Sequence, residues 1–150
     1  MSTRSMTVLS SKNGVDLNLY RHLDGYPAVA GKDLADTLSQ VKGSTADLAR
    51  ALLAVCSSSG RACYELTETK PEHHGDLEHV YAVVADLDGE GCFVSWVIYH
   101  FERSLWSPRK GSTEYFNWPS KRYTLDAFLD LTNQQADAMS KRETLLATRA

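Results

Sequence analysis

The end of one predicted strand and the turn after it gather side chains that can carry chemistry. Arg21 and His22 close an apolar-alternating run, and Asp24 and Tyr26 follow in an Asp-Gly-Tyr-Pro turn. Arg4 stands on the preceding run, which a hairpin would place alongside. A histidine beside a carboxylate and two guanidinium groups can bind an anion or transfer a proton. The alternative is architectural: Asp24 caps the turn and pairs with an arginine, while His22 faces solvent.

Metal-ligating residue types are concentrated in the stretch His-His-Gly-Asp-Leu-Glu-His. It contains His73, His74, Asp76, Glu78 and His79. Imidazole and carboxylate groups suit zinc and related metal ions. Neighbouring residues of a strand point to opposite faces, however, so Glu78 and His79 would diverge. The pattern therefore predicts no metal site, and because no phosphate-binding glycine loop is present either, we expect no cofactor.

Aromatic and basic residues are interleaved in the stretch 103–122. Those expected to contact a partner are Arg103, Trp106, Arg109, Lys110, Tyr115, Phe116 and Trp118. Aromatic side chains among cations are typical of an interface hot spot or of a groove for single-stranded nucleic acid. The net charge of −3 makes nucleic acid the weaker option. In the alternative interpretation the aromatic residues fold a long loop onto the sheet.

Turn signals and apolar periodicity divide the chain into strands and helices. Alternating runs at 3–11 and 15–22 flank Asn13-Gly14, which favours a tight hairpin. The other predicted elements are helices over 31–41, 44–58 and 124–147, strands over 62–69, 77–87 and 92–102, and a long loop over 103–122. Ser44, Thr45 and Thr124 are candidate helix caps. The predicted fold class is α+β: a single domain with a mainly antiparallel sheet of about five strands, two helices after the first hairpin and a C-terminal helix.

The composition limits the classes of protein to which this chain can belong. The 150 residues are 43% hydrophobic and 23% charged, which is typical of one globular domain. No apolar run approaches the ~20 residues of a membrane span, and the N-terminus lacks the apolar core of a signal peptide. Cys56, Cys63 and Cys92 form no Cys-x-x-Cys pair, which favours reduced thiols. We therefore expect a cytoplasmic protein.

An ordered set of motifs carries a resemblance to a known family. The set comprises Thr3-Arg4-Ser5, Tyr20 with Asp24-Gly25-Tyr26-Pro27 after it, Gly31 with Leu34-Ala35 and Leu38, and the stretch from Gly75 to Val84. It resembles small, mostly uncharacterised proteins of bacteria, prophages and phages, over most of residues 3–100. Ala28-Val29-Ala30 and His79 depart from the Ser-Gly-x and Tyr that are frequent in that family. The resemblance implies a mobile-element accessory protein, located in the host cytoplasm if it is phage-encoded, and it implies no common catalytic activity.

Two functions follow from these patterns. The first is non-enzymatic binding of a host or phage protein through the stretch 103–122, as in counter-defence proteins similar to anti-CRISPR inhibitors, with homo-oligomerisation through the C-terminal helix as a further contact. The alternative is a binding protein or enzyme for a small anionic or nucleotide-like ligand, with a pocket at the Asp-Gly-Tyr-Pro turn. Its ligand-binding residues would be Arg4, Arg21, His22, Asp24 and Tyr26. A concave pocket with these side chains converging would favour the alternative.

Overall fold

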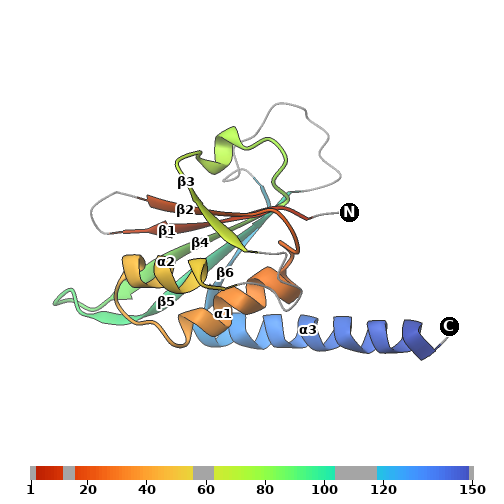
Figure 1. Cartoon of the computed structure of the whole chain (residues 1–150). Coiled ribbons are helices and arrows are strands. Elements are labelled where there is room, and N and C mark those ends of the chain that lie inside the picture. Colours follow the sequence, from red (N-terminus) through yellow and green to blue (C-terminus); the bar gives the residue numbers. More distant parts are fainter. Residues whose placement is uncertain (1–2, 12–15, 56–62, 104–117, 149–150) are drawn as a thin grey trace.

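Six strands form one mixed sheet in the computed structural model, which describes residues 3–11, 16–55, 63–103 and 118–148 (Figure 1). The strands are β1 (Ser5–Ser10), β2 (Asp16–Arg21), β3 (Tyr64–Thr67), β4 (His79–Leu87), β5 (Phe93–Glu102) and β6 (Ser120–Thr124). Their order across the sheet is β3-β2-β1-β4-β5-β6. Strands β1 and β4 pair in parallel, and the other four pairings are antiparallel. The predicted α+β domain with a mainly antiparallel sheet is confirmed.

The sequence-based prediction misses one strand, β6. This strand falls at the end of the stretch predicted as a loop over 103–122 and at the start of the predicted helix. Its sequence Ser-Lys-Arg-Tyr-Thr contains one large apolar residue, Tyr123, and only that side chain is partly buried. The strand forms because it pairs with β5 between Val97 and Phe101. Pairing with a neighbour, and not its own alternation, therefore defines β6.

Three α-helices pack on the same face of the sheet, which we call the helix-covered face (Figure 1). They are α1 (Lys32–Leu38), α2 (Thr45–Leu53) and α3 (Leu125–Thr148), and two short helical elements, η1 (Pro27–Gly31) and η2 (Pro71–His73), precede α1 and β4. Two predicted helix caps are confirmed. The Oγ of Ser44 accepts a hydrogen bond from the backbone N–H of Asp47 at 3.3 Å, and the Oγ1 of Thr124 accepts one from Ala127 at 3.2 Å.

The sheet separates two apolar clusters. The larger one lies on the helix-covered face and includes Leu9, Leu19, Leu34, Leu38, Leu48, Leu52, Tyr81, Trp96, Ile98 and Phe128. The smaller one lies on the opposite face and consists of Met6, Val8, Leu77 and Val80, with Tyr20, Phe101 and Trp118 packed against it. Successive residues of β1, β2, β4 and β5 thus contribute to different clusters, as expected for strands buried on both faces.

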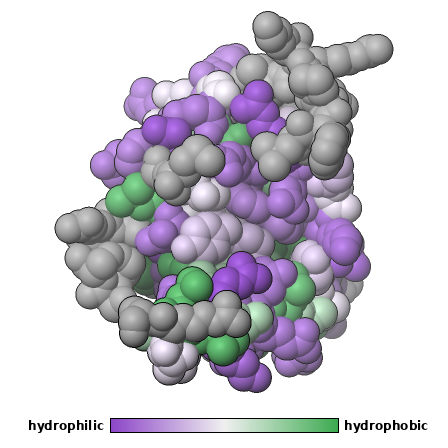
Figure 2. Space-filling view, turned by 90° about the vertical axis from the view of Figure 1, so that its right-hand side faces the viewer, coloured by the Kyte–Doolittle hydropathy of each residue, from purple (hydrophilic) through white to green (hydrophobic). Residues whose placement is uncertain are grey.

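The second half of α3 extends beyond the sheet (Figure 1). Every residue from Ser140 to Thr148 is exposed, and Leu145 and Leu146 retain 58% and 62% of their accessible surface. Within the described part of the chain, no helix is both long enough and apolar enough to cross a membrane. The end of the molecule shown in Figure 2 is mostly hydrophilic, with scattered hydrophobic side chains. Oligomerisation through α3 stays a prediction.

The cysteines differ from the expectation of three reduced thiols. Cys63 is disulfide-bonded, whereas Cys92 is a free and exposed thiol. Cys56 lies outside the described residues. The expectation is wrong for Cys63 because the absence of a Cys-x-x-Cys pair does not exclude a disulfide. The cysteines therefore no longer support a reducing compartment.

Candidate functional site

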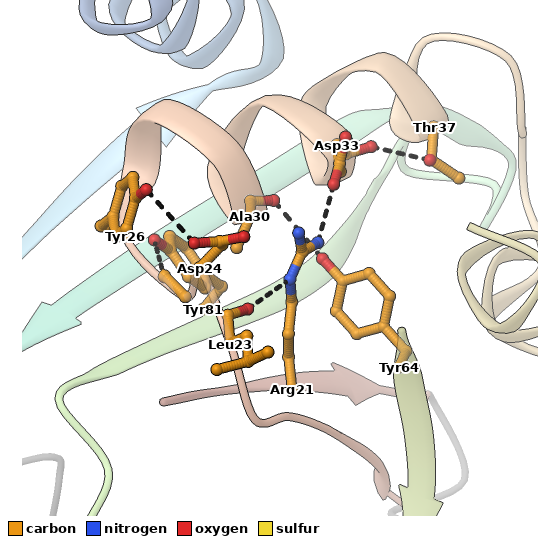
Figure 3. A network of polar contacts seen from close by, with 10 residues as sticks. Arg21, Leu23, Asp24, Tyr26, Ala30, Asp33, Thr37, Tyr64 and Tyr81 are labelled. Atoms are coloured by element: carbon orange, nitrogen blue, oxygen red, sulfur yellow. Dashed lines mark hydrogen bonds and ion pairs between the residues drawn. The ribbon is translucent and has the colours of Figure 1, made fainter. Parts of the chain in front are cut away.

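The Asp-Gly-Tyr-Pro turn joins β2 to η1 (Figure 3) and packs tightly against the start of β1. The backbone N–H of Gly25 donates to the carbonyl oxygen of Thr3 at 2.8 Å, and its carbonyl accepts from the hydroxyl of Tyr81 at 2.9 Å. A Cβ at Gly25 would lie 2.8 Å from the backbone nitrogen of Ser5. The positive φ of the turn, 56°, belongs to Asp24. Glycine is thus required at position 25 by close backbone approach.

Arg21 is a buried structural cation beneath α1 (Figure 3). Its side chain is 0% exposed, its Nη1 donates to Oδ2 of Asp33 at 2.7 Å, and its Nε donates to the carbonyl of Leu23 at 3.0 Å. The guanidinium lies over the ring of Tyr64, 5.2 Å from its centroid. Burial lowers the pKa of Arg21, but Tyr64 and Asp33 raise that pKa by more, so the side chain stays charged. Arg21 ties β2, β3 and α1 together.

The structure does not bring the five predicted ligand-binding residues into one pocket. Arg21 points into the helix-covered face, and Asp24 and Tyr26 bond to each other in the turn, Oη to Oδ1 at 3.3 Å. His22 and Arg4 lie on the opposite face, with Arg4 Nε 3.4 Å from His22 Nδ1. Alternation along β2 separates Arg21 from His22, because neighbouring residues of a strand point to opposite faces.

On the opposite face, Arg4 and His22 belong to a closed ring of contacts, the surface cluster: Arg4, Tyr20, His22, His74 and Asp76. Asp76 accepts from Arg4 Nε at 3.0 Å and lies 2.7 Å from Nδ1 of His74. The ring of His74 stacks on that of Tyr20, with centroids 4.4 Å apart. The hydroxyl of Tyr20 lies 3.0 Å from Nδ1 of His22 and so completes the ring.

The surface cluster offers several donors around one carboxylate. Arg4 and His74 both direct nitrogen atoms at Asp76, whose side chain is 48% exposed. Burial, and then the negative charge of Asp76, raise the pKa of Tyr20, which keeps its phenol protonated and able to donate. An incoming carboxylate or phosphate would compete with Asp76 for the same donors. Sequence reasoning did not select Tyr20 for this site, although its position two residues before His22 places both on one face.

The metal-ligating residue types of the stretch 73–79 do not converge. His74 and Asp76 belong to the surface cluster, whereas His79 is buried and pairs with His100. His74 and Asp76 precede β4, so the path of the chain between η2 and β4 sets this divergence. His100 was not singled out from the sequence, because it stands in an apolar run and becomes a partner of His79 only through the register of β4 with β5.

Two residues of the stretch 103–122 that were expected to contact a partner lie within the described chain, Arg103 and Trp118. The backbone N–H of Arg103 donates to the carbonyl of Glu78 at 2.9 Å, and its Nη1 donates to that of Gly75 at 3.2 Å. Trp118 is half-buried against the smaller apolar cluster. The remaining predicted contact residues, Trp106, Arg109, Lys110, Tyr115 and Phe116, lie outside the described residues.

Comparison of the chain with known protein families, with curated proteins and with solved structures gives no match. The assignment of function therefore depends on the geometry of the sheet and its two faces.

Proposed function

We propose that the protein acts by binding another protein through the face of the sheet opposite the helices, with the stretch 103–122 as the main contact. In this proposal the protein is not an enzyme. The resemblance described above extends the proposal to a phage or mobile-element accessory role, in which the bound protein belongs to the host and the binding counters its defence.

The observation that carries this proposal is the anchoring of both ends of the stretch on the opposite face. At one end, Arg103 bonds to Glu78 and Gly75. At the other, Trp118 packs against the smaller apolar cluster, which lies on that face. Both described ends of the stretch therefore contact the opposite face, where no described α-helix packs against the sheet. A long connection anchored in this way is typical of binding loops on a rigid scaffold.

The described surface at these anchors has the composition of an interface. Trp118 and Phe101 are both half-buried against the smaller apolar cluster, so each offers additional aromatic area to a partner. Arg103 is exposed beside them, and Arg4 is 29% exposed in the adjoining surface cluster. Aromatic residues and arginine are enriched in interface centres, where they contribute a large share of the binding energy.

Affinity capture from host cells followed by mass spectrometry tests the proposal. Trp118→Ala should remove the captured protein, whereas Leu66→Ala, which trims an exposed apolar side chain on β3, and His22→Ala should retain it. Arg21→Ala is unsuitable as a control because its side chain is buried. Far-UV circular dichroism must show that all variants are folded. Capture that persists in Trp118→Ala and disappears in His22→Ala would overturn the proposal.

A second candidate function, binding of a small anion, is favoured by the surface cluster itself. Its arginine and the imidazole of His74 lie against an accessible carboxylate, and the imidazole of His22 lies beside the arginine. Titration with inorganic phosphate and with a nucleoside monophosphate, followed by NMR of the imidazole groups, tests this function. Saturable shifts of His22 and His74 that vanish in Arg4→Met would support it, and shifts that are unchanged in Arg4→Met would refute it.

A further inference from the structure

A buried pair of histidines lies on the helix-covered face, behind the surface cluster. His79 begins β4, and His100 lies near the end of β5. Their exposed fractions are 6% and 9%, and Nδ1 of His79 lies 2.9 Å from Nε2 of His100. The two rings are nearly parallel, at 17° with centroids 5.1 Å apart. In the metal-free chain one of these nitrogens carries a proton and donates it to the other.

Glu102 adds a carboxylate to the histidine pair. It is the direct cross-strand partner of His79, so its side chain projects from the same face of the sheet. One ligand atom from each of His79, His100 and Glu102 lies within 4.8 Å of the others. Glu102 is exposed, so its carboxylate can rotate toward the two nitrogens without disturbing the core. Two imidazoles and one carboxylate form a donor set that zinc binds in catalytic sites.

A pocket gives access to this donor set. It has a volume of about 300 Å³ and is lined by His100 and Glu102. Ser120 and Lys121 of β6, Pro27 of η1 and Gln135 of α3 form other parts of its wall. The ammonium of Lys121 favours an anion beside the metal position. The pocket can thus admit an ion and hold a water molecule or an anionic ligand next to it.

We propose that His79, His100 and Glu102 bind a divalent transition metal ion, with zinc the best match, and that the pocket holds the fourth ligand. Bond lengths near 2.0–2.1 Å place two nitrogens of a tetrahedral zinc site about 3.3 Å apart. The nitrogens of the histidine pair, at 2.9 Å, therefore need to separate only slightly. The opposing possibility is that the pair is a purely structural hydrogen bond. This inference is independent of the proposed binding function.

Zinc binding to chelator-treated protein, measured by calorimetry, tests the site, with cobalt as a spectroscopic probe. We expect one ion per chain and the visible absorption of tetrahedral cobalt without a thiolate band. Glu102→Gln should weaken zinc binding at least about tenfold, and His100→Gln should abolish it. Because Glu102 is exposed, its variant should fold, and it decides the question if circular dichroism shows that His100→Gln does not.

The surface cluster supplies a matched control, because it also contains histidine and aspartate. The double variant His74→Gln, Asp76→Asn should retain both the affinity for zinc and the cobalt spectrum. Cys92→Ser serves as a background that removes the free thiol. No saturable binding by the wild type would overturn the proposal, as would binding that disappears in the surface-cluster variant or is unchanged in Glu102→Gln.

Discussion

The histidine pair and the surface cluster lie at the same end of the sheet, on opposite faces, and they use similar side chains for different chemistry. In the histidine pair, burial holds His79 and His100 neutral and in direct contact. In the surface cluster, His74 lies against the carboxylate of Asp76 within reach of water. The comparison indicates that burial, and not residue type, decides which histidines of this chain suit a metal ion and which suit an anion.

The same comparison applies to the two arginines near the turn. Arg21 and Arg4 each pair with an aspartate, at 2.7 Å and 3.0 Å, but their exposed side-chain fractions are 0% and 29%. A buried pair is strongly coupled to packing, whereas water weakens an exposed one. The arginine–aspartate pair on the helix-covered face should therefore contribute more to stability than the pair on the opposite face.

The largest expected effect separates these two arginines. Arg21→Ala should lower the free energy of unfolding by about 3 kcal/mol or more, because it removes a buried side chain and leaves Asp33 unpaired. Arg4→Ala should cost less than about 1 kcal/mol. Arg21→Met, which keeps most of the volume, should recover part of the loss. Urea denaturation measures all three, and equal losses for Arg21→Ala and Arg4→Ala would break the comparison.

The next effect is an acid sensitivity that belongs to the histidine pair. The pKa of His100 is about 4 when folded and 6.5 ordinarily, so between these values the unfolded chain binds a proton that the folded chain does not. Stability should therefore fall as the pH is lowered from about 6.5 to about 4, by an amount on the order of 3 kcal/mol.

Urea midpoints measured in chelator at about pH 7 and about pH 4.5 check this dependence. His100→Gln should reduce the loss of stability, whereas His74→Gln, the matched change in the surface cluster, should leave it as in the wild type. An acid dependence that follows His74 would assign the sensitivity to the opposite face and contradict the comparison.

The sequence predicts where the strands and helices lie along the chain better than it predicts which strands pair with one another. Alternation and cap residues place β1, β2, α2 and the start of α3 close to their observed positions. The strand β6 is not predicted by these patterns, because it is stabilised by its pairing with β5. The parallel pairing of β1 with β4 is equally hidden, since it joins residues that are distant in sequence.

The sites show the same division between local and long-range information. Strand alternation accounts for the separation of Arg21 from His22. The pairing of His79 with His100 depends on the register of two strands, which no local spacing reveals. The contact of Tyr20 with His74 depends on how the chain around η2 lies over the sheet. Residue types indicate which side chains could form a site, but strand register and the path of the loops decide which of these side chains come into contact.

A smaller effect distinguishes two glycines. A Cβ at Gly25 would press against the backbone of Ser5, so Gly25→Ala should cost about 1–3 kcal/mol. At Gly75, beside the surface cluster, a Cβ would have no neighbour within 4 Å, and Gly75→Ala should change stability by less than about 0.5 kcal/mol. Thermal unfolding of the two variants gives the comparison. An unchanged melting temperature for Gly25→Ala would show that the backbone of the turn can shift to accommodate a Cβ at position 25.

The smallest expected effect lies within the surface cluster itself. Arg4 and Asp76 are 29% and 48% exposed, so a double-mutant cycle with Arg4→Ala and Asp76→Asn should give a coupling energy below about 1 kcal/mol. Raising the salt concentration should reduce this coupling, because mobile ions screen exposed charges. Urea denaturation of the four proteins at low and high salt provides the measurement. A coupling above about 2 kcal/mol that is insensitive to salt would mean that the cluster is held as tightly as a buried pair. Its donors would then be committed to Asp76, and the case for anion binding on this face would fail.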